Sequence, residues 1–361
     1  MVQFSSIFTG FTKSIAIRNG KKSKHDVGRE AADALAKEAK KNEMMLTSSG
    51  YVAGASENLA VAFSKGGKKG INQDTFIVWE DFGCQDDMIF CGVFDGHGPW
   101  GHLVAKRVRK LMPPALLRNW QKLVAHTMDG DGINGIDTSC FQFDIWKQCY
   151  FETCSIIDQK LEQHADSFYS GTTALTLVRQ GDLLVVANVG DSRAVLATTD
   201  DHGRLVSVQL TVDLKPNLPR ESERILQSRG RVLSCEDEPG VYRVWMPTVE
   251  GPGLAISRAF GDYYIKDFGL ISEPDLTSRN ITHRDQFAIV ATDGVWDVMS
   301  NKEAVEIVSS TAQREEAAKR LVESAICAWK RKRRGVPMDD ISAICLFFHN
   351  IPPSKQQAKI V

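Results

Sequence analysis

The sequence predicts an α+β fold, because short apolar runs of strand length and longer amphipathic stretches share one part of the chain. The strand-like runs begin near residue 59 and end near residue 348. Stretches such as 144–165 and 314–331 instead repeat apolar residues at helical spacing. No internal repeat and no linker divides this region. We therefore expect one large domain that contains both sheets and helices.

The composition is that of an ordinary soluble globular protein. The chain has 361 residues, of which 43% are hydrophobic and 25% charged, and its formal net charge is −1. Such a balance creates no global field that attracts nucleic acid, so we expect no nucleic-acid partner. No apolar run has the length of a transmembrane helix, and no secretory signal is present. The eight cysteines form no Cys-x-x-Cys pair, which favours reduced thiols in a cytoplasmic protein over a disulfide framework.

The first half of this region alternates strands with helices. Strands joined by short polar or Gly-rich loops, typical of an antiparallel sheet, are expected at 59–63, 75–79 and 88–94. Two helices should follow, separated by the Pro113-Pro114 pair, which we expect to break the helix between residues 111 and 115. After a Gly- and Asp-rich surface loop at 128–138, a long amphipathic helix is predicted at 144–165.

Further strands and helices are expected in the second half. The strands lie at 172–178, 183–188, 194–197, 205–210, 287–292 and 343–348. Residues 215–237 have the pattern of a loop with a short helix, and the proline-containing stretch 238–253 resembles an irregular flap. Amphipathic helices are predicted at 302–310 and 314–331.

Aspartates stand at the ends of five of these strands. They are Asp74, Asp95, Asp191, Asp293 and Asp339. In the clearest case an apolar run ends at Asp95-Gly96-His97-Gly98, where the glycines let the backbone approach a ligand. Burying a lone carboxylate costs several kcal/mol unless it is paired or binds a metal. A metal site with oxygen ligands therefore explains the pattern better than five tight turns with surface aspartates.

Seven sequence blocks in this order resemble the type 2C metal-dependent protein phosphatases, the serine/threonine enzymes of the PPM family. The blocks are residues 70–74, 90–98, 170–174, 189–193, 254–262, 293–297 and 339–342. They span nearly all of residues 58–349, so the match is specific. The sequence motifs GKKGINQD and FDGHGPWGH are most similar to those of the plant branch, in particular of the group called clade E.

This resemblance implies a four-layer α/β/β/α sandwich of two antiparallel β-sheets flanked by helices. The catalytic domain would cover residues 51–350, after a basic amphipathic or flexible segment at 1–50 and before a flexible tail at 351–361. The implied activity is hydrolysis of phosphoserine and phosphothreonine in phosphorylated protein substrates, typical of a plant signalling phosphatase. Water activated by two Mg²⁺ or Mn²⁺ ions would attack the phosphate directly.

The resemblance also implies roles for individual residues. Asp95 would bridge both metals, the Gly96 carbonyl would bind one of them, and Asp293 and Asp339 would complete the other. Asp74 would hold metal-bound water. Asp191 and Asp297, together with Asp293, match a weaker third metal site. His97 matches the general acid that protonates the leaving alkoxide, and an imidazole has the near-neutral pKa that this role needs. The alternative for His97 is a structural histidine held by backbone contacts.

Three positions depart from the pattern of that family. Lys69 stands where many members carry a phosphate-binding arginine, and a lysine lacks the bidentate fork. Gln73 stands where many carry glutamate, which removes a negative charge near the metals. Asp340 replaces a common asparagine, a change that we expect to be minor because Asp339 is the expected ligand. Weaker metal or phosphate affinity is expected, with activity retained.

Two other functions fit parts of the pattern. A pseudophosphatase scaffold would bind phosphoproteins without turnover, but the expected ligands Asp95, Asp293 and Asp339 are all present. A small-molecule phosphatase would share the same site, and a comparison of activity on phosphopeptides and on phosphorylated metabolites would distinguish it from a protein phosphatase.

In the flap, Trp245 aligns with a tryptophan that clade A relatives offer to abscisic-acid receptors. Because Pro99-Trp100 replaces the glycine-rich sequence of that clade, we interpret Trp245 as flap packing.

The N-terminal segment favours membrane association. Residues 2–25 carry five cations and no acid, and their apolar residues fall on one helical face. Such a segment can lie on an anionic membrane surface, and a plain tail is the alternative. We expect a cytoplasmic monomer attached peripherally to the cytoplasmic face of the plasma membrane through residues 2–25. The basic cluster 330–334 leaves the nucleus as another location, although cations also suit the end of a helix.

Overall fold

The computed structural model describes residues 52–53, 59–85, 87–128, 138–235, 238–248 and 251–349. The amphipathic segment expected at 2–25, most of the loop at 128–138 and the tail from 351 onward lie outside the described residues. Among the helices that are described, none is both long enough and apolar enough to span a bilayer.

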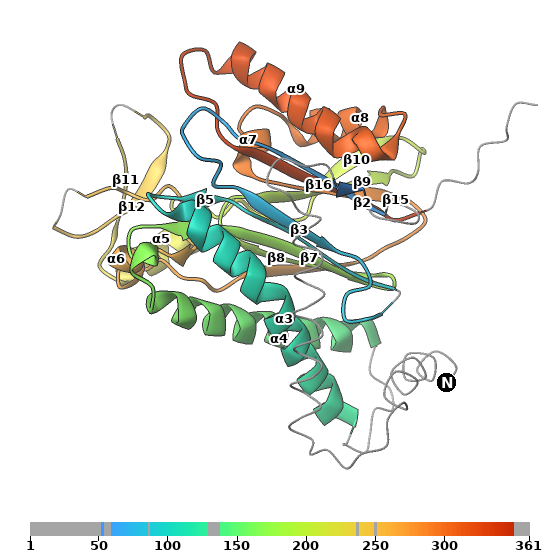
Figure 1. The fold of residues 1–361 in the computed structure, drawn as a ribbon, viewed down its shortest axis with the longest axis horizontal. Coiled ribbons are helices and arrows are strands. Elements are labelled where there is room, and N and C mark those ends of the chain that lie inside the picture. Colours follow the sequence, from blue (N-terminus) through green and yellow to red (C-terminus); the bar gives the residue numbers. More distant parts are fainter. Residues whose placement is uncertain are drawn as a thin grey trace, which may run out of the picture.

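Two antiparallel sheets form the centre of the fold (Figure 1). The six-stranded sheet has the order β1 (Val52–Ala53), β2 (Ala60–Lys65), β16 (Ile341–Phe347), β15 (Asp285–Ala291), β9 (Arg193–Thr199), β10 (Leu205–Gln209). The five-stranded sheet has the order β14 (Asp275–Asn280), β8 (Leu183–Val189), β7 (Ala174–Gln180), β4 (Met88–Phe94), β3 (Thr75–Trp79).

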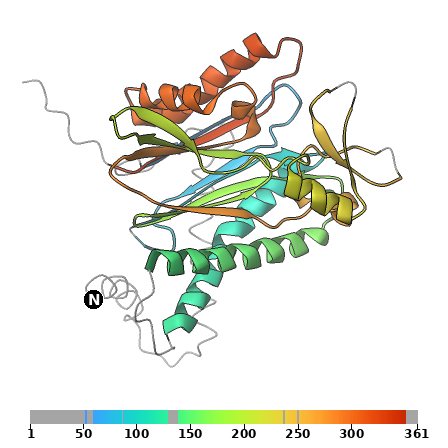
Figure 2. The same cartoon turned by 180° about the vertical axis from the view of Figure 1, so that it is seen from behind.

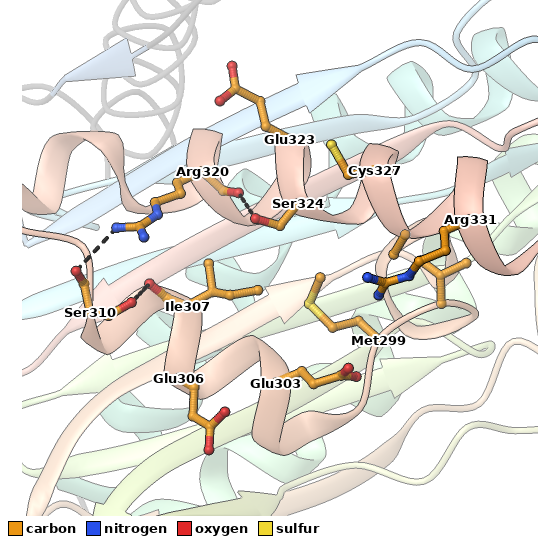
Figure 3. A pocket seen from close by; sticks show the side chains of 12 residues that line it. Met299, Glu303, Glu306, Ile307, Ser310, Arg320, Glu323, Ser324, Cys327 and Arg331 are labelled. Carbon is orange, nitrogen blue, oxygen red and sulfur yellow. Dashed lines mark hydrogen bonds between the residues drawn. The ribbon is translucent and has the colours of Figure 1, made fainter.

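Helices cover the outer face of each sheet (Figures 1 and 2). Helices α3 (Gly101–Met128) and α4 (Thr138–Glu162) pack on the five-stranded sheet. Helices α8 (Asn301–Ser309) and α9 (Ala317–Lys332) pack on the six-stranded sheet, and a cavity of about 520 Å³ lies between them (Figure 3). This arrangement confirms the predicted α/β/β/α sandwich.

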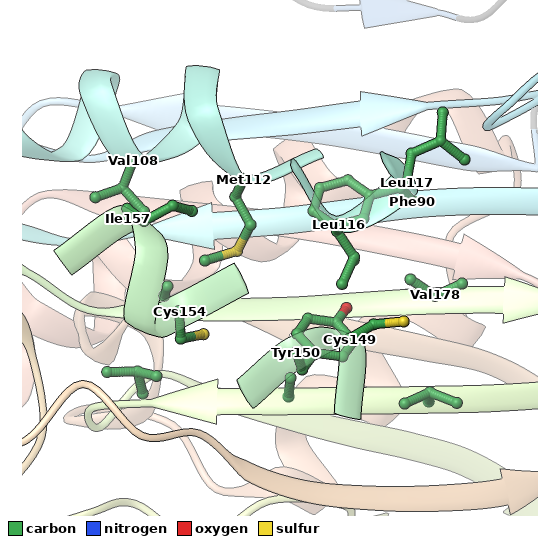
Figure 4. Packing of buried hydrophobic residues seen from close by; sticks show 14 of the residues in the cluster. Phe90, Val108, Met112, Leu116, Leu117, Cys149, Tyr150, Cys154, Ile157 and Val178 are labelled. Carbon is green, nitrogen blue, oxygen red and sulfur yellow. The ribbon is translucent and has the colours of Figure 1, made fainter. Parts of the chain in front are cut away.

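Strand β4 explains why the sandwich holds together, because all seven of its residues are buried. Phe90 and Phe94 belong to the apolar cluster that the sheet shares with α3 and α4 (Figure 4). The alternating residues Ile89, Cys91 and Val93 belong to the cluster between the two sheets. A strand with both faces covered has no polar alternation, which is why its sequence is a continuous apolar run. Burial of each large apolar side chain stabilises the fold by about 1.5–3 kcal/mol.

Helix α3 continues through Pro113 and Pro114, so the prediction of two separate helices is wrong. A proline inside a helix costs about 3 kcal/mol, because it removes a hydrogen bond and clashes with the preceding turn. Around the two prolines, Met112, Leu116 and Leu117 are almost fully buried against the sheet. Their combined burial outweighs the cost of the prolines. The apolar face of α4 lies in the same cluster, which confirms the predicted amphipathic helix.

The region between β10 and β15 contains more regular structure than the sequence predicted. After α5 (Pro219–Gln227), strands β11 (Arg231–Ser234) and β12 (Tyr242–Trp245) form a hairpin, so the flap is not wholly irregular. Strand β14 was also missed. Its sequence DLTSRN is polar because it forms the edge of its sheet, and only packing reveals it as a strand.

A small three-stranded sheet brings distant segments together at one end of the sandwich. Its order is β13 (Phe260–Gly261), β6 (Gly171–Thr172), β5 (Gly96–His97). The short helix α6 (Tyr263–Lys266) follows β13, and the short helix α7 (Asp293–Trp296) follows β15.

Because apolar burial carries α3 through its prolines, Met112→Ala should lower the free energy of unfolding by about 2–5 kcal/mol. Pro114→Ala should not destabilise the protein, since the helix is already continuous at that position. Urea denaturation followed by circular dichroism measures both. A larger loss for Pro114→Ala than for Met112→Ala would mean that the prolines form a required turn.

Candidate active site

Antiparallel pairing brings the strand-end aspartates to one end of the sandwich. Thr75 at the start of β3 pairs with Phe94 at the end of β4, so Asp74 lies next to Asp95. In the other sheet, Ala291 at the end of β15 pairs with Ala343 in β16, which brings Asp293 close to Asp339.

Asp74 also connects the two sheets. Its Oδ2 accepts a hydrogen bond from the Thr292 hydroxyl at 2.9 Å, and that hydroxyl oxygen accepts one from the Ser342 N–H at 3.0 Å. Asp74 precedes a strand of the five-stranded sheet, whereas Thr292 and Ser342 belong to the six-stranded side. The carboxylate therefore fixes how the two sheets meet at this end.

A cavity of about 310 Å³ opens between these strand ends. The charged residues and the histidine that line it are Lys69, Asp95, His97, Asp191, Arg243, Asp293, Asp339 and Asp340. Five carboxylates thus face one small volume together with two cationic side chains. Asp74 lies buried behind the lining, and Asp297 lies outside it.

The electrostatics of the cavity favour a bound cation. Burial raises the pKa of Asp95, Asp74 and Asp293 well above the usual range, and repulsion among neighbouring carboxylates raises each pKa further. One oxygen of Asp74 and one of Asp293 are buried without a hydrogen-bond partner. Orphaned anionic oxygens of this kind are costly unless a cation balances them.

The described carboxylates line a cavity and do not enclose a closed cage. No three His, Cys, Asp or Glu side chains of the described residues are already arranged around a single point. Mg²⁺ and Mn²⁺ prefer oxygen ligands, and Mg²⁺ keeps several of its waters. The donor set therefore fits hard divalent cations that bring water into the cavity.

Gly96 is required by close packing. A Cβ atom at this position would lie 2.5 Å from the Gly101 carbonyl oxygen and 2.8 Å from that of Gln73. The preceding residue is fixed by two hydrogen bonds: the Asp95 N–H donates to the Thr173 hydroxyl at 3.0 Å, and the Thr173 N–H donates to the Asp95 carbonyl at 2.9 Å. The backbone at Asp95 and Gly96 is consequently held rigid at the cavity wall.

His97 is paired with Asp262, a residue that the sequence analysis did not assign. The distance from His97 Nε2 to Asp262 Oδ2 is 2.6 Å, and Asp262 is almost fully buried. Burial alone would lower the pKa of His97, but the charge and hydrogen bond of Asp262 outweigh it, so the pKa is raised. A Cβ atom at Gly171 would overlap Asp262 Oδ2, which explains the glycine at that position.

Lys69 and Gln73 both reach the cavity. The Lys69 ammonium is ion-paired with Asp339, and the Gln73 side-chain amide donates to the Gly98 carbonyl at 3.0 Å. Asp340 has more contacts than expected from its sequence position. Its two carboxylate oxygens accept hydrogen bonds from the N–H groups of Gly67 and Gln73, each at 2.7 Å. Asp340 therefore holds the loop that carries Lys69 against the start of β16.

Two of the three aspartates expected at a third metal site are each paired with a cation of the protein. Asp191 is buried and ion-paired with Lys215, which the sequence analysis placed in a loop without a role. Burial opposes the charge of Lys215, but Asp191, Asp293 and Asp297 together raise its pKa. Asp297 is exposed and lies 3.7 Å from Arg333.

Two other features lie away from the aspartates. The Trp245 Nε1–H donates to the Leu233 carbonyl at 3.2 Å and its ring packs on Gly253, consistent with flap packing. In the larger cavity between α8 and α9 (Figure 3), Glu303 caps the start of α8 and lies 3.6 Å from Lys332. Because its three acids, Glu303, Glu306 and Glu323, are exposed to solvent, that cavity is a weaker candidate than the smaller one.

Without a cation, the buried carboxylates should destabilise the fold. In chelator, Asp293→Asn should therefore raise the free energy of unfolding by about 1 kcal/mol or more, because it removes a charge that burial and neighbours disfavour. Since the folded-state pKa values are raised, stability in chelator should fall as the pH rises above the usual aspartate range. Urea denaturation at several pH values measures this.

Asp200→Asn provides a matched control, because Asp200 is held by hydrogen bonds from Arg204 and His202 that lower its pKa. That substitution should leave the protein less stable or unchanged. If Asp293→Asn also lowered the stability in chelator, the carboxylates would not repel one another as described.

Comparison with known proteins places these features in a family. Residues 68–331 match the family model described as protein phosphatase 2C. "Probable protein phosphatase 2C 73" of Arabidopsis thaliana is 59% identical, over 97% of this chain and 95% of that protein. "Probable protein phosphatase 2C 48" of Oryza sativa subsp. japonica is 54% identical, over 98% of this chain and all of that protein. The crystal structure of a serine-threonine phosphatase 2C from Toxoplasma gondii superposes with a TM-score of 0.72 at 27% identity, covering 80% of this chain and 94% of that one.

Proposed function

Because this chain belongs to the protein phosphatase 2C family and is a metal-dependent protein serine/threonine phosphatase, we propose that its 310 Å³ cavity hydrolyses phosphoserine and phosphothreonine at two divalent metal ions. The observation that carries the proposal is the convergence of buried, mutually repelling carboxylates beside a histidine. Mg²⁺ or Mn²⁺ fits the all-oxygen donor set.

The metal ligands are proposed from the positions around the cavity. Asp95 and the Gly96 carbonyl would hold one cation, and Asp95, Asp293 and Asp339 the other, with Asp74 acting through water. When bound, two such cations lower the pKa of a water molecule and screen the phosphoryl oxygens. The rigid backbone at Asp95 would keep the ligands in place through the reaction.

His97 is proposed as the general acid for the leaving serine or threonine alkoxide. Asp262 orients the ring through Nε2 and raises the pKa of His97, which favours the protonated imidazole that a general acid needs. Because Asp262 occupies Nε2, the other ring nitrogen, Nδ1, is the candidate donor to the substrate. Lys69 would contact the phosphate as a point charge, although its pairing with Asp339 competes with that contact.

A third, weaker metal site is proposed at Asp191, Asp293 and Asp297. Its weakness follows from the two cations already there, because Lys215 pairs with Asp191 and Arg333 approaches Asp297. A third divalent ion would have to displace the Lys215 ammonium from Asp191, and this lowers its apparent affinity.

Hydrolysis of a phosphothreonine peptide should require Mg²⁺ or Mn²⁺, and Asp95→Asn should lower kcat by at least about 10³. His97→Ala should cost about 10²–10⁴ on the peptide but much less on p-nitrophenyl phosphate, whose phenolate leaves without a proton. Steady-state kinetics with both substrates tests this.

As a control, Asp200→Asn should leave both rates unchanged, since Asp200 lies on a surface turn. Full peptide hydrolysis in chelator would contradict the metal mechanism. Equal losses for His97→Ala on both substrates would remove His97 from the acid role.

We also propose that residues 2–25 attach the enzyme to the cytoplasmic face of a membrane. Each basic residue near an anionic leaflet contributes about 1 kcal/mol, and the apolar face adds burial in the headgroup region. The full chain should therefore sediment with phosphatidylserine vesicles at low salt and be released at high salt. A chain that starts at Lys41 is the control, and equal binding by both chains would contradict the proposal.

A further inference from the structure

A group of aromatic side chains remains exposed next to the cavity. This aromatic shelf consists of the exposed residues Trp100, Phe168 and Tyr169 and the half-buried Tyr264. Trp100 is 53% exposed and Tyr169 is 58% exposed, although rings of this size are normally buried. The Phe168 and Tyr169 rings are 4.7 Å apart, and the Tyr169 and Tyr264 rings are 5.2 Å apart. The last three therefore form a continuous apolar surface.

Backbone contacts join the shelf to the cavity wall. The Trp100 N–H donates to the Ser170 hydroxyl at 2.9 Å, which brings Trp100 beside the segment that carries Tyr169. Gly98 lines the cavity and packs so tightly on the Tyr169 carbonyl that a Cβ atom there would overlap it. Trp100 and Tyr169 thus lie on segments that contact the cavity wall formed by His97 and Gly98.

The other end of the shelf reaches the flap. The Tyr264 hydroxyl donates to the Pro252 carbonyl at 3.1 Å, and the Tyr264 N–H donates to the Phe168 carbonyl at 3.2 Å. Leu254, two residues after Pro252, lines the cavity. The shelf is therefore joined to the cavity wall through the backbone contact at Gly98 and through the segment that leads to Leu254. It lies beside the cavity in which we place the phosphorylated residue.

We propose that the aromatic shelf binds a large apolar side chain, one or two residues from the phosphorylated residue of a protein substrate. This inference rests on the proposed function of the cavity. Consecutive Cα atoms are about 3.8 Å apart, so a neighbouring residue of an extended peptide reaches the rim while the phosphate occupies the cavity. Tyrosine and tryptophan supply large contact areas at low entropic cost, which is why they dominate binding hot spots.

The shelf favours a substrate peptide over a separate regulatory protein as its partner, because its segments are in contact with those that line the cavity. An apolar neighbour should act mainly on KM, since the shelf contacts none of the reacting atoms. An open shelf discriminates less than an enclosed pocket, and we expect a preference of about 5–10-fold in kcat/KM.

The test uses the full chain with Mn²⁺ and phosphothreonine peptides that differ at one position. Leucine, phenylalanine, serine or aspartate is placed at each position from two before to two after the phosphothreonine. The wild type should prefer leucine or phenylalanine over serine at one or more of these positions, through a lower KM. Tyr169→Ser and Trp100→Ser should each reduce that preference and leave the rates on the serine peptide and on p-nitrophenyl phosphate unchanged.

Val336→Ser is the matched control, because Val336 is similarly exposed at 52% in the loop after α9. It should keep the wild-type preference. Absence of any preference in the wild type, or its full retention in both shelf variants, would overturn the inference, and the shelf would then be a surface for another protein. Loss of p-nitrophenyl phosphate hydrolysis by the wild type would instead contradict the proposed function itself.

Discussion

Repulsion among buried carboxylates is the constraint on which the rest of the site depends. Asp74, Asp95 and Asp293 are brought together where the two sheets meet, and their raised pKa values reflect that proximity. An apolar core would not retain three such groups, because each costs free energy unless a cation balances it. The sandwich supplies the stability that this end requires, since β4 and its neighbours are buried on both faces.

A second set of residues holds the carboxylate cluster and His97 in position. Asp340 ties the loop of residues 67–73 to the start of β16, Thr292 links Asp74 across the sheets, and Asp262 holds His97. Glycines at 96 and 171 leave room for these contacts. Lys69 and Lys215 each pair with a carboxylate at the edge of the cluster, so part of its charge is balanced by the protein.

Much of the fold could be predicted because its strands are apolar on both faces. Strands β3 and β4 have the predicted bounds, and the strand-end aspartates of β3, β4, β15 and β16 meet as the pattern indicated. Strand β14 was missed because its residues are polar. The continuity of α3 was missed because the two prolines are visible in the sequence as helix breakers, whereas the tertiary burial that stabilises the helix is not. Asp262 and Lys215 were missed for another reason: each pairs with a residue far away in the chain, and no local signal marks such a partner. The sequence offered one indication of Asp262, which is the last residue of the matching block 254–262.

We propose that the strand-end carboxylates hold two catalytic metal ions. Anomalous diffraction at the manganese edge, from crystals grown with Mn²⁺, tests it most directly. We expect two anomalous peaks in the cavity, both beside Asp95, with one at the Gly96 carbonyl and the other between Asp293 and Asp339. Absence of peaks there at a Mn²⁺ concentration that supports full activity would contradict it.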